Sequence, residues 1–206
     1  MKGALDCAAP DLGATFHATQ ALLKAIAGGE TADVVILTDE GIAELMAQGK
    51  LAGKAQPVGR SGVGIAVRAG APKPDISTLD AMKRSLLGAE SVAHSRMGAS
   101  GLYFASLLER LGLADKLKKR VIVDKGPVGA AIARGDAQVG AQLLCELAPV
   151  PGIDIVGPLP AEVQNYNAFS AAVMKDCQNP AAADAFMRFL RSDALRAAMK
   201  KNLFEA

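Results

Sequence analysis

Residues 91–111, SVAHSRMGASGLYFASLLERL, contain the pattern that decides the fold class. Ser91–His94 is a short run typical of a strand, and a glycine-rich turn, Arg96–Gly101, follows it. Leu102–Leu111 then repeats apolar side chains at helical spacing. A strand, a tight glycine turn and a helix in this order form the building unit of a parallel α/β sheet.

The same alternation of strand and helix patterns extends in both directions along the chain. We interpret Val34–Leu37 as a buried parallel strand, and a turn at Pro57–Gly59 precedes a second strand at Gly62–Arg68. Further strands are predicted at 121–123, 139–144, within 149–160 and at 168–174, and helices at 18–27, 39–48, 77–87, 128–134 and 179–204 with a break near 192. This order predicts an α/β fold.

Charge and composition exclude nucleic-acid binding. The chain has 206 residues, of which 50% are hydrophobic, with 23 basic and 21 acidic side chains and a formal net charge of +2. Its densest basic run, Lys116–Arg120, follows the end of a helix pattern, where cations are favourable, and no basic face accompanies it. We therefore expect no nucleic-acid partner.

The spacing of cysteine and histidine argues against a metal centre. Cys7, Cys145 and Cys177 form no CxxC motif, and His17 and His94 form no HxxxH pair. Zinc sites are built from such closely spaced ligands. We predict no metal site and no cofactor.

The first residues, MKGALDCAAPDLGATF, contain one lysine but no sustained apolar segment, so they do not match a signal peptide. No apolar run reaches the roughly 18 residues that a membrane-spanning helix needs. The sequence alone is therefore compatible with a cytoplasmic protein, or with an exported one whose signal is absent from it.

Three turns that open predicted helices share small or polar residues, at 17–20, 97–101 and 125–128. Free N–H groups and the helix dipole at such starts attract anions, and glycine allows close backbone approach. Thr19 and Ser100 add hydroxyl donors, and Arg60 can form a fork with a carboxylate or an oxyanion. We predict a small-anion site, although each turn taken alone also fits ordinary helix capping.

Catalytic motifs are absent from the sequence. It contains no GxSxG elbow and no GxxxxGK[ST] loop, and Gly62–Gly64 lies within a strand pattern instead of opening a helix. Asp39 and Glu40 begin a helix, where carboxylates stabilise the dipole. We therefore assign no catalytic residue.

Four segments in order resemble a known family: GGETADVVILTDEGIAELMAQGKL (28–51), RSGVGIAVRAGAPKPDISTLDAMKRSLL (60–87), GASGLYFASLLERLG (98–112) and PGIDIVGPLPAEVQ (151–164). They are similar to the molybdate-binding-protein-like branch of the type II periplasmic solute-binding proteins, the receptors of ABC importers. The resemblance implies a two-lobed α/β fold with parallel-rich sheets and crossover strands. The first lobe would comprise residues 1–65 and 160–206, and the second 66–159.

The resemblance also implies a function. The protein would bind a small anion, an oxyanion or an organic carboxylate, in a cleft between the lobes. It would lie in the periplasm and deliver its ligand to the membrane component of an ABC importer. The family's ligand-binding positions match Thr19, Arg60, Ser61, Ala99, Ser100, Val128 and Gln142. Molybdate binders place a tyrosine near Gln142 where this sequence has Leu143, so a carboxylate held by Arg60 fits as well as molybdate.

Two alternatives stay open. The first is an isomerase acting on a small unsaturated di- or tricarboxylic acid such as aconitate, because some relatives resemble such enzymes. Such a reaction needs an acid and a base beside a clamped carboxylate, with Glu146 or His94 as candidates and Arg60 as the clamp. Since no acid/base pair stands out, we predict no turnover of cis- or trans-aconitate. The second alternative is a ligand-free paralogue that acts as an interaction module.

The N-terminal segment departs from the family pattern, which opens with a strand and a binding loop. No apolar strand-like run precedes Phe16, since Asp6, Pro10 and Gly13 interrupt the segment. We expect an open sheet edge beside Val34–Leu37 and hence a homodimer or a larger assembly. Affinity for molybdate should then be weak or absent.

Overall fold

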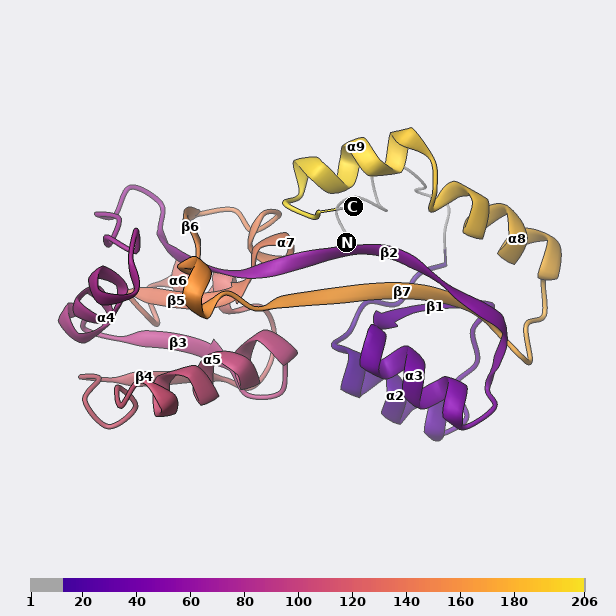
Figure 1. The fold of residues 1–206 in the computed structure, drawn as a ribbon, viewed down its shortest axis with the longest axis horizontal. Coiled ribbons are helices and arrows are strands. Elements are labelled where there is room, and N and C mark those ends of the chain that lie inside the picture. Colours follow the sequence, from indigo (N-terminus) through magenta and orange to yellow (C-terminus); the bar gives the residue numbers. More distant parts are fainter. Residues whose placement is uncertain (1–12, 206) are drawn as a thin grey trace. The chain divides into compact units, whose positions relative to one another are not determined.

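The computed structural model describes residues 13–205, and the chain divides into two compact units. Unit 1 extends to Arg60 and resumes at Asn167, whereas unit 2 comprises Ser61–Tyr166. Two strands, β2 (Leu51–Arg68) and β7 (Tyr166–Met174), contain the points where the chain passes between units (Figure 1). The lobe boundaries predicted at residues 65–66 and 159–160 remain a prediction.

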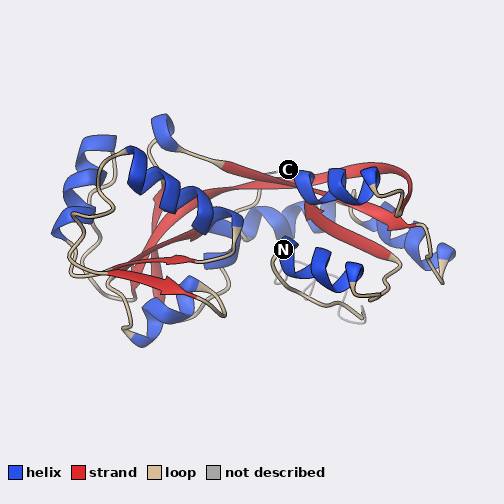
Figure 2. Ribbon diagram, turned by 90° about the horizontal axis from the view of Figure 1, so that it is seen from below, coloured by secondary structure: helices blue, strands red, loops and turns tan. Residues whose placement is uncertain are grey.

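Unit 2 is built on a mixed sheet with the strand order β2-β5-β3-β4. β3 (Val92–Ser95) pairs in parallel with β4 (Arg120–Val123) and with β5 (Val139–Leu143). β2 pairs antiparallel with β5 and with β6 (Ile153–Pro158). The helices are α4 (Leu79–Gly88), α5 (Ala99–Arg110), α6 (Val128–Arg134) and α7 (Leu144–Leu147), with a 3-10 turn at Ala161–Val163. Helices lie on both faces of this sheet (Figure 2).

The helices of unit 2 dock through apolar faces spaced by three or four residues. In α5, Phe104, Leu107 and Leu108 are completely or almost completely buried. In α6, Val128 and Ile132 share one core cluster with Leu147 of α7. Burial of each such side chain contributes about 1.5–3 kcal/mol relative to exposure. This packing fixes where the helices begin.

Unit 1 contains α2 (Thr19–Ala27), β1 (Val34–Thr38), α3 (Asp39–Ala47), α8 (Pro180–Phe189) and α9 (Asp193–Lys201). β1 pairs antiparallel with β7, and β7 neighbours β2. α2 and α3 pack against β1 and β7 through a core that includes Leu23, Leu37 and Leu45. In Figure 1 these two helices lie on one side of the strands, and α8 and α9 lie on the other.

Helix starts fall into two groups according to whether a side chain caps them. Thr38, Thr78, Asn179 and Ser192 accept hydrogen bonds from the first turns of α3, α4, α8 and α9. The residues that precede α2, α5, α6 and α7 provide no such bond. A side-chain cap satisfies donors that would otherwise need another partner. The second group therefore keeps backbone donors for other acceptors.

Several predictions about individual elements are wrong. The run at Val34–Leu37 forms a strand, but its ladder partner among residues 13–205 is the antiparallel β7 and not a parallel strand. The turn predicted at Pro57–Gly59 lies inside β2, which extends from Leu51. Local propensity favours a turn there, but pairing in the sheet overrides it. α5 begins at Ala99, three residues before the predicted Leu102, and α7 was not predicted.

The predicted absence of a strand before Phe16 falls on residues 2–12, which lie outside the described residues. Within the part that the structure describes, β1 pairs with one strand, β7. The expected assembly into dimers stays a prediction. No helix in this part of the chain is long and apolar enough to cross a membrane.

Candidate functional site

Three helices of unit 2 begin at the same edge of the sheet. β4, β3 and β5 are neighbours that run in one direction. α5 follows β3, α6 follows β4 and α7 follows β5. Ligands of open α/β sheets bind at the carboxyl ends of parallel strands, where such helix starts converge. We call this region the carboxyl edge of unit 2, and it contains Ser61, Ala99, Ser100, Val128 and Gln142 of the predicted site.

The start of α5 presents donors without partners. Gly98, its N-cap residue, has no capping side chain, and no described residue accepts a hydrogen bond from the N–H groups of Ala99, Ser100 or Gly101. Ser100, the second residue of the helix, is 2% exposed. Among the described residues the buried side-chain atom without a hydrogen-bond partner is His94 Nε2 and not the Ser100 hydroxyl.

Two glycines allow this helix start to approach β3 closely. A Cβ at Gly101 would lie 2.1 Å from the carbonyl oxygen of Ser95, and one at Gly98 would lie 2.6 Å from Ser95 Oγ. At Gly101 the neighbour is backbone, so a side chain there would force the helix start to move, whereas at Gly98 the Ser95 hydroxyl could move aside. The glycine-rich turn was identified in the sequence, but its contact with Ser95 carries no sequence signal.

The start of α6 is joined to β5 by Gln142. The backbone N–H of Gly129 donates to Gln142 Oε1 at 3.2 Å. Gln142 is buried, and its side chain lowers the pKa of the Glu146 carboxyl group of α7. Val128 is fully buried in the core, so only its backbone N–H is suited to the binding role predicted for it.

The start of α7 is held by Ser61 of β2. Ser61 is completely buried, and its Oγ accepts from the N–H of Cys145 at 3.1 Å. Burial raises the pKa of the Cys145 thiol to about 11, so this cysteine stays protonated at neutral pH. It is therefore unsuited to act as a nucleophile.

Glu146 introduces an acidic side chain into the carboxyl edge. The residue is exposed, yet desolvation by the surrounding protein raises the pKa of its carboxyl group, and the neighbouring Gln142 side chain lowers this pKa in part. A carboxyl group with a raised pKa beside helix starts is a candidate for proton exchange.

His94 lies on β3, beneath α5. Its ring is buried and lies 6.3 Å from the Phe104 ring, centroid to centroid. Nδ1 contacts the carbonyl oxygen of Ser95 at 3.1 Å, and Nε2 has no hydrogen-bond partner. Desolvation is the main reason why the pKa of His94 is lowered. Its predicted acid/base role stays a prediction.

Thr19 and Arg60 belong to unit 1, and both make structural contacts there. Thr19 Oγ1 accepts from the N–H of Thr38 at 3.3 Å. Arg60 Nε donates to Glu205 Oε2 at 2.9 Å, and the backbones of these two residues exchange two hydrogen bonds. Their predicted roles in ligand binding stay predictions.

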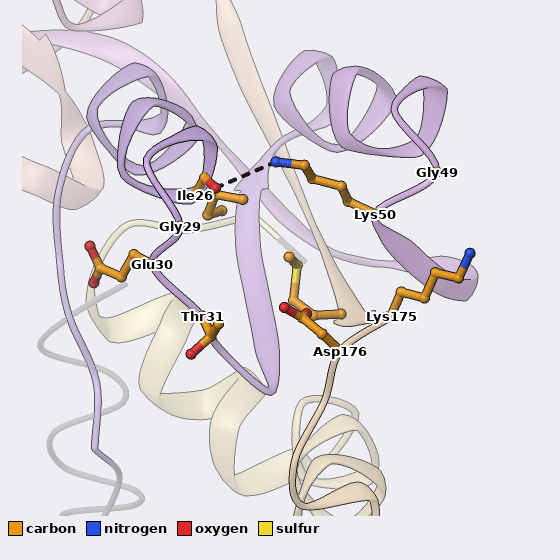
Figure 3. Close-up of a pocket in the computed structure, with 9 residues that line it drawn as sticks. Ile26, Gly29, Glu30, Thr31, Gly49, Lys50, Lys175 and Asp176 are labelled. Atoms are coloured by element: carbon orange, nitrogen blue, oxygen red, sulfur yellow. Dashed lines mark hydrogen bonds between the residues drawn. The ribbon is translucent and has the colours of Figure 1, made fainter.

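A surface hollow of about 280 Å³ in unit 1 contains none of the predicted site residues. It lies at the ends of α2, α3 and β7 and is lined by Ile26, Gly29, Glu30, Thr31, Gly49, Lys50, Met174, Lys175 and Asp176. Figure 3 shows Lys50 pointing across it to Ile26, whose carbonyl oxygen accepts from Nζ at 3.4 Å. Its charges are mixed, so it shows no preference for an anion. No group of His, Cys, Asp or Glu in the described part of the chain is arranged to hold a metal.

Comparisons with known proteins agree with this architecture. Residues 11–205 match the family model described as bacterial extracellular solute-binding protein. An aconitate isomerase from Pseudomonas sp. is 43% identical over 194 residues, which cover 92% of this chain and 72% of that protein.

Solved structures show the fold. The periplasmic molybdate-binding protein of Azotobacter vinelandii superimposes with a TM-score of 0.75 at 22% identity, covering 92% of this chain and 84% of that one. The sulfate-binding protein of Mycobacterium tuberculosis H37Rv gives a TM-score of 0.64 at 21% identity, covering 91% and 73%. The predicted α/β fold of the two-lobed periplasmic binding proteins is thereby confirmed.

Proposed function

The chain belongs to the bacterial extracellular solute-binding proteins, as its sequence resemblance predicted, and we propose that it binds a small organic carboxylate at the carboxyl edge of unit 2. The observation that carries this proposal is the start of α5. Its first N–H groups have no acceptor among the described residues, and the Ser100 hydroxyl belongs to the same turn. An anion would satisfy these donors and gain from the helix dipole.

The chemistry of the edge favours a carboxylate ligand. Two planar oxygens match two neighbouring backbone N–H groups, as at an oxyanion-binding helix start. The relative that is 43% identical is named for aconitate, which is an unsaturated tricarboxylate.

A calorimetric titration tests the proposal. We expect trans-aconitate, cis-aconitate or citrate to bind more tightly than sulfate or molybdate at pH 7. Ser100→Ala should weaken carboxylate binding by about 5-fold to 150-fold, which corresponds to roughly 1–3 kcal/mol for a lost buried partner. Ser106→Ala, at an exposed position on the same helix, is the matched control. Absence of binding for the whole panel would refute the proposal.

The proposal includes delivery to a membrane partner. We propose that the protein acts outside the cytoplasmic membrane and presents its ligand to the membrane component of an ABC importer, since the family description is that of extracellular solute-binding proteins. Fractionation of cells that produce the full gene product should place it in the periplasm. Recovery in the cytoplasm alone would contradict this part.

Isomerisation of aconitate is the second candidate function, and the 43% identity to an aconitate isomerase favours it. Glu146 would be its acid/base group, because its carboxyl lies at the carboxyl edge with a raised pKa. Proton NMR of trans-aconitate with the protein decides between the candidates. Formation of cis-aconitate above the rate in buffer would establish the isomerase, and its absence would support the sequence-based prediction of no turnover.

A further inference from the structure

His94 contains the buried side-chain atom that has no hydrogen-bond partner in the described part of the chain. The residue lies on β3 and is 4% exposed. Its Nδ1 contacts the carbonyl oxygen of Ser95 at 3.1 Å, and since a carbonyl oxygen only accepts, the proton of the neutral ring lies on Nδ1 and Nε2 keeps a lone pair. A buried lone pair without a partner costs stability, so packing alone does not account for a histidine at this position.

Ser95 connects the His94 ring to the start of α5. Its carbonyl oxygen, which accepts from His94 Nδ1, lies so close to the backbone of Gly101 that a Cβ there would overlap it. Ser95 is also the last residue of β3, opposite Val123 of β4. The carbonyl group therefore lies between the imidazole ring and the first turn of the helix. Because protein interiors are close-packed, a shift of the ring displaces that turn.

A second contact joins the ring to α5 one turn later. Phe104 is completely buried, and its ring centroid lies 6.3 Å from that of His94, with 57° between the ring planes. Gly101 and Phe104 are three residues apart, so they lie on one face of the helix. This face packs against β3. Two contacts on the same face fix both the height and the tilt of the helix start above the strand.

We propose that His94 is a positioning residue of the candidate site. Through the Ser95 carbonyl group, its Nδ1–H sets the position of the N–H groups of Ala99, Ser100 and Gly101. This inference rests on the proposed function, in which these N–H groups receive the ligand carboxylate. Hydrogen bonds depend steeply on distance and angle, so a small displacement of the first turn weakens several donors together.

Two substitutions separate the hydrogen bond from the packing of the ring. His94→Asn keeps an N–H at the place of Nδ1, since both nitrogens are attached to Cγ, but leaves a gap beside Phe104. His94→Leu keeps the apolar bulk and has no donor. In calorimetry with trans-aconitate, His94→Leu should bind about 2-fold to 12-fold more weakly than wild type, the equivalent of one net hydrogen bond, and His94→Asn should bind more tightly than His94→Leu. His17→Leu, at an exposed position of unit 1, is the control and should bind as wild type.

Urea unfolding of the same variants gives a readout that a purely structural role would not produce. His94→Asn replaces a buried ring with a smaller polar side chain, so it should be less stable than His94→Leu. The inference therefore expects opposite orders of stability and affinity in these two variants. It is wrong if affinity follows stability, or if His94→Leu binds trans-aconitate as tightly as wild type.

NMR of the free protein keeps this inference separate from the proposed function. The ring nitrogen resonances of His94 in wild type should show a protonated Nδ1 and an unprotonated Nε2. The amide resonances of Ala99, Ser100 and Gly101 should shift in His94→Leu and return toward their wild-type positions in His94→Asn. A proton on Nε2 in wild type, or equal amide shifts in both variants, would overturn the inference. If these NMR results are as expected but wild-type protein binds no carboxylate, the proposed function alone fails.

Discussion

Units 1 and 2 differ in how many of their helix starts a side chain caps. In unit 1, Thr38, Asn179 and Ser192 cap α3, α8 and α9, and only α2 among its described helices has no cap. In unit 2, Thr78 caps α4, but α5, α6 and α7 have no side-chain cap of their own. The first turns of α6 and α7 donate to Gln142 and Ser61 of neighbouring strands. A capped start contributes stability, whereas an uncapped start keeps its donors for a ligand.

Strand direction explains why the donors of unit 2 converge. β3, β4 and β5 are parallel, so the helices that follow them begin at one edge. β1 and β7 are antiparallel, so α3 and α8, which follow them, begin at opposite edges. Similar local patterns therefore produce a shared donor surface in one unit and separate helix starts in the other. Four changes test this difference, and they are ordered by expected effect.

Gly101→Ala should have the largest effect, because the added Cβ would lie 2.1 Å from the Ser95 carbonyl oxygen. The start of α5 must then shift, with a loss of about 1–3 kcal/mol of unfolding free energy and of carboxylate binding. Gly88→Ala is the control, since nothing lies within 4 Å of a Cβ there. Urea unfolding with unchanged stability for Gly101→Ala would show that this close approach is unimportant.

Acid should destabilise the fold through His94. Its pKa is lowered in the folded protein, mainly by desolvation, so the unfolded chain binds the proton more readily. The contribution of His94 is complete above pH 6.5 and is lost as the pH falls from 6.5 through the folded pKa, by at most about 1.4 kcal/mol per pH unit. Unfolding measured from pH 8 to 5 should show this loss in wild type and in His17→Gln, but not in His94→Gln. If His94→Gln lost the same amount of unfolding free energy, titratable groups other than His94 would be responsible for the acid sensitivity.

Thr19→Ala tests unit 1 directly. The substitution removes the hydrogen bond from the N–H of Thr38 to Thr19 Oγ1, and we expect a loss of about 0.5–1.5 kcal/mol of unfolding free energy. Thr15→Ala, at an exposed position, should have no effect. Calorimetry on the same two variants measures the ligand-binding role predicted for Thr19. If Thr19→Ala lowered the affinity for the ligand but left the unfolding free energy unchanged, Thr19 would act as a ligand-binding residue and not as a structural one.

Glu205→Gln should have the smallest effect. Glu205 pairs with Arg60, but the two side chains are 51% and 57% exposed, and such ion pairs contribute about 0.2–1 kcal/mol. The backbone hydrogen bonds between the two residues would remain. Thermal unfolding in low and high salt should show a small difference that salt removes. A loss of several kcal/mol would mean that this pair organises unit 1.

The parts of the candidate site that could be predicted from the sequence are those marked by a local sequence pattern. The glycine-rich turn at 97–101 and the Pro127 start of α6 were evident because glycine and proline restrict the backbone in known ways. The likeness of four segments to solute-binding proteins predicted the α/β fold and the family. Glu146 was named as a candidate, but the helix that holds it was not predicted, since four residues show no helical period.

What the sequence determined by itself was most of the order of strands and helices, the glycine and proline turns that open helices, and the family, because periodicity, glycine and proline act over a few neighbouring residues. Only the tertiary structure decided that β1 is antiparallel to β7, that Pro57–Gly59 continues β2, and that Gln142 of β5 accepts from the start of α6. These features depend on pairing between segments far apart in the chain. Such pairing is governed by burial and hydrogen bonding across the sheet, and no local pattern records it.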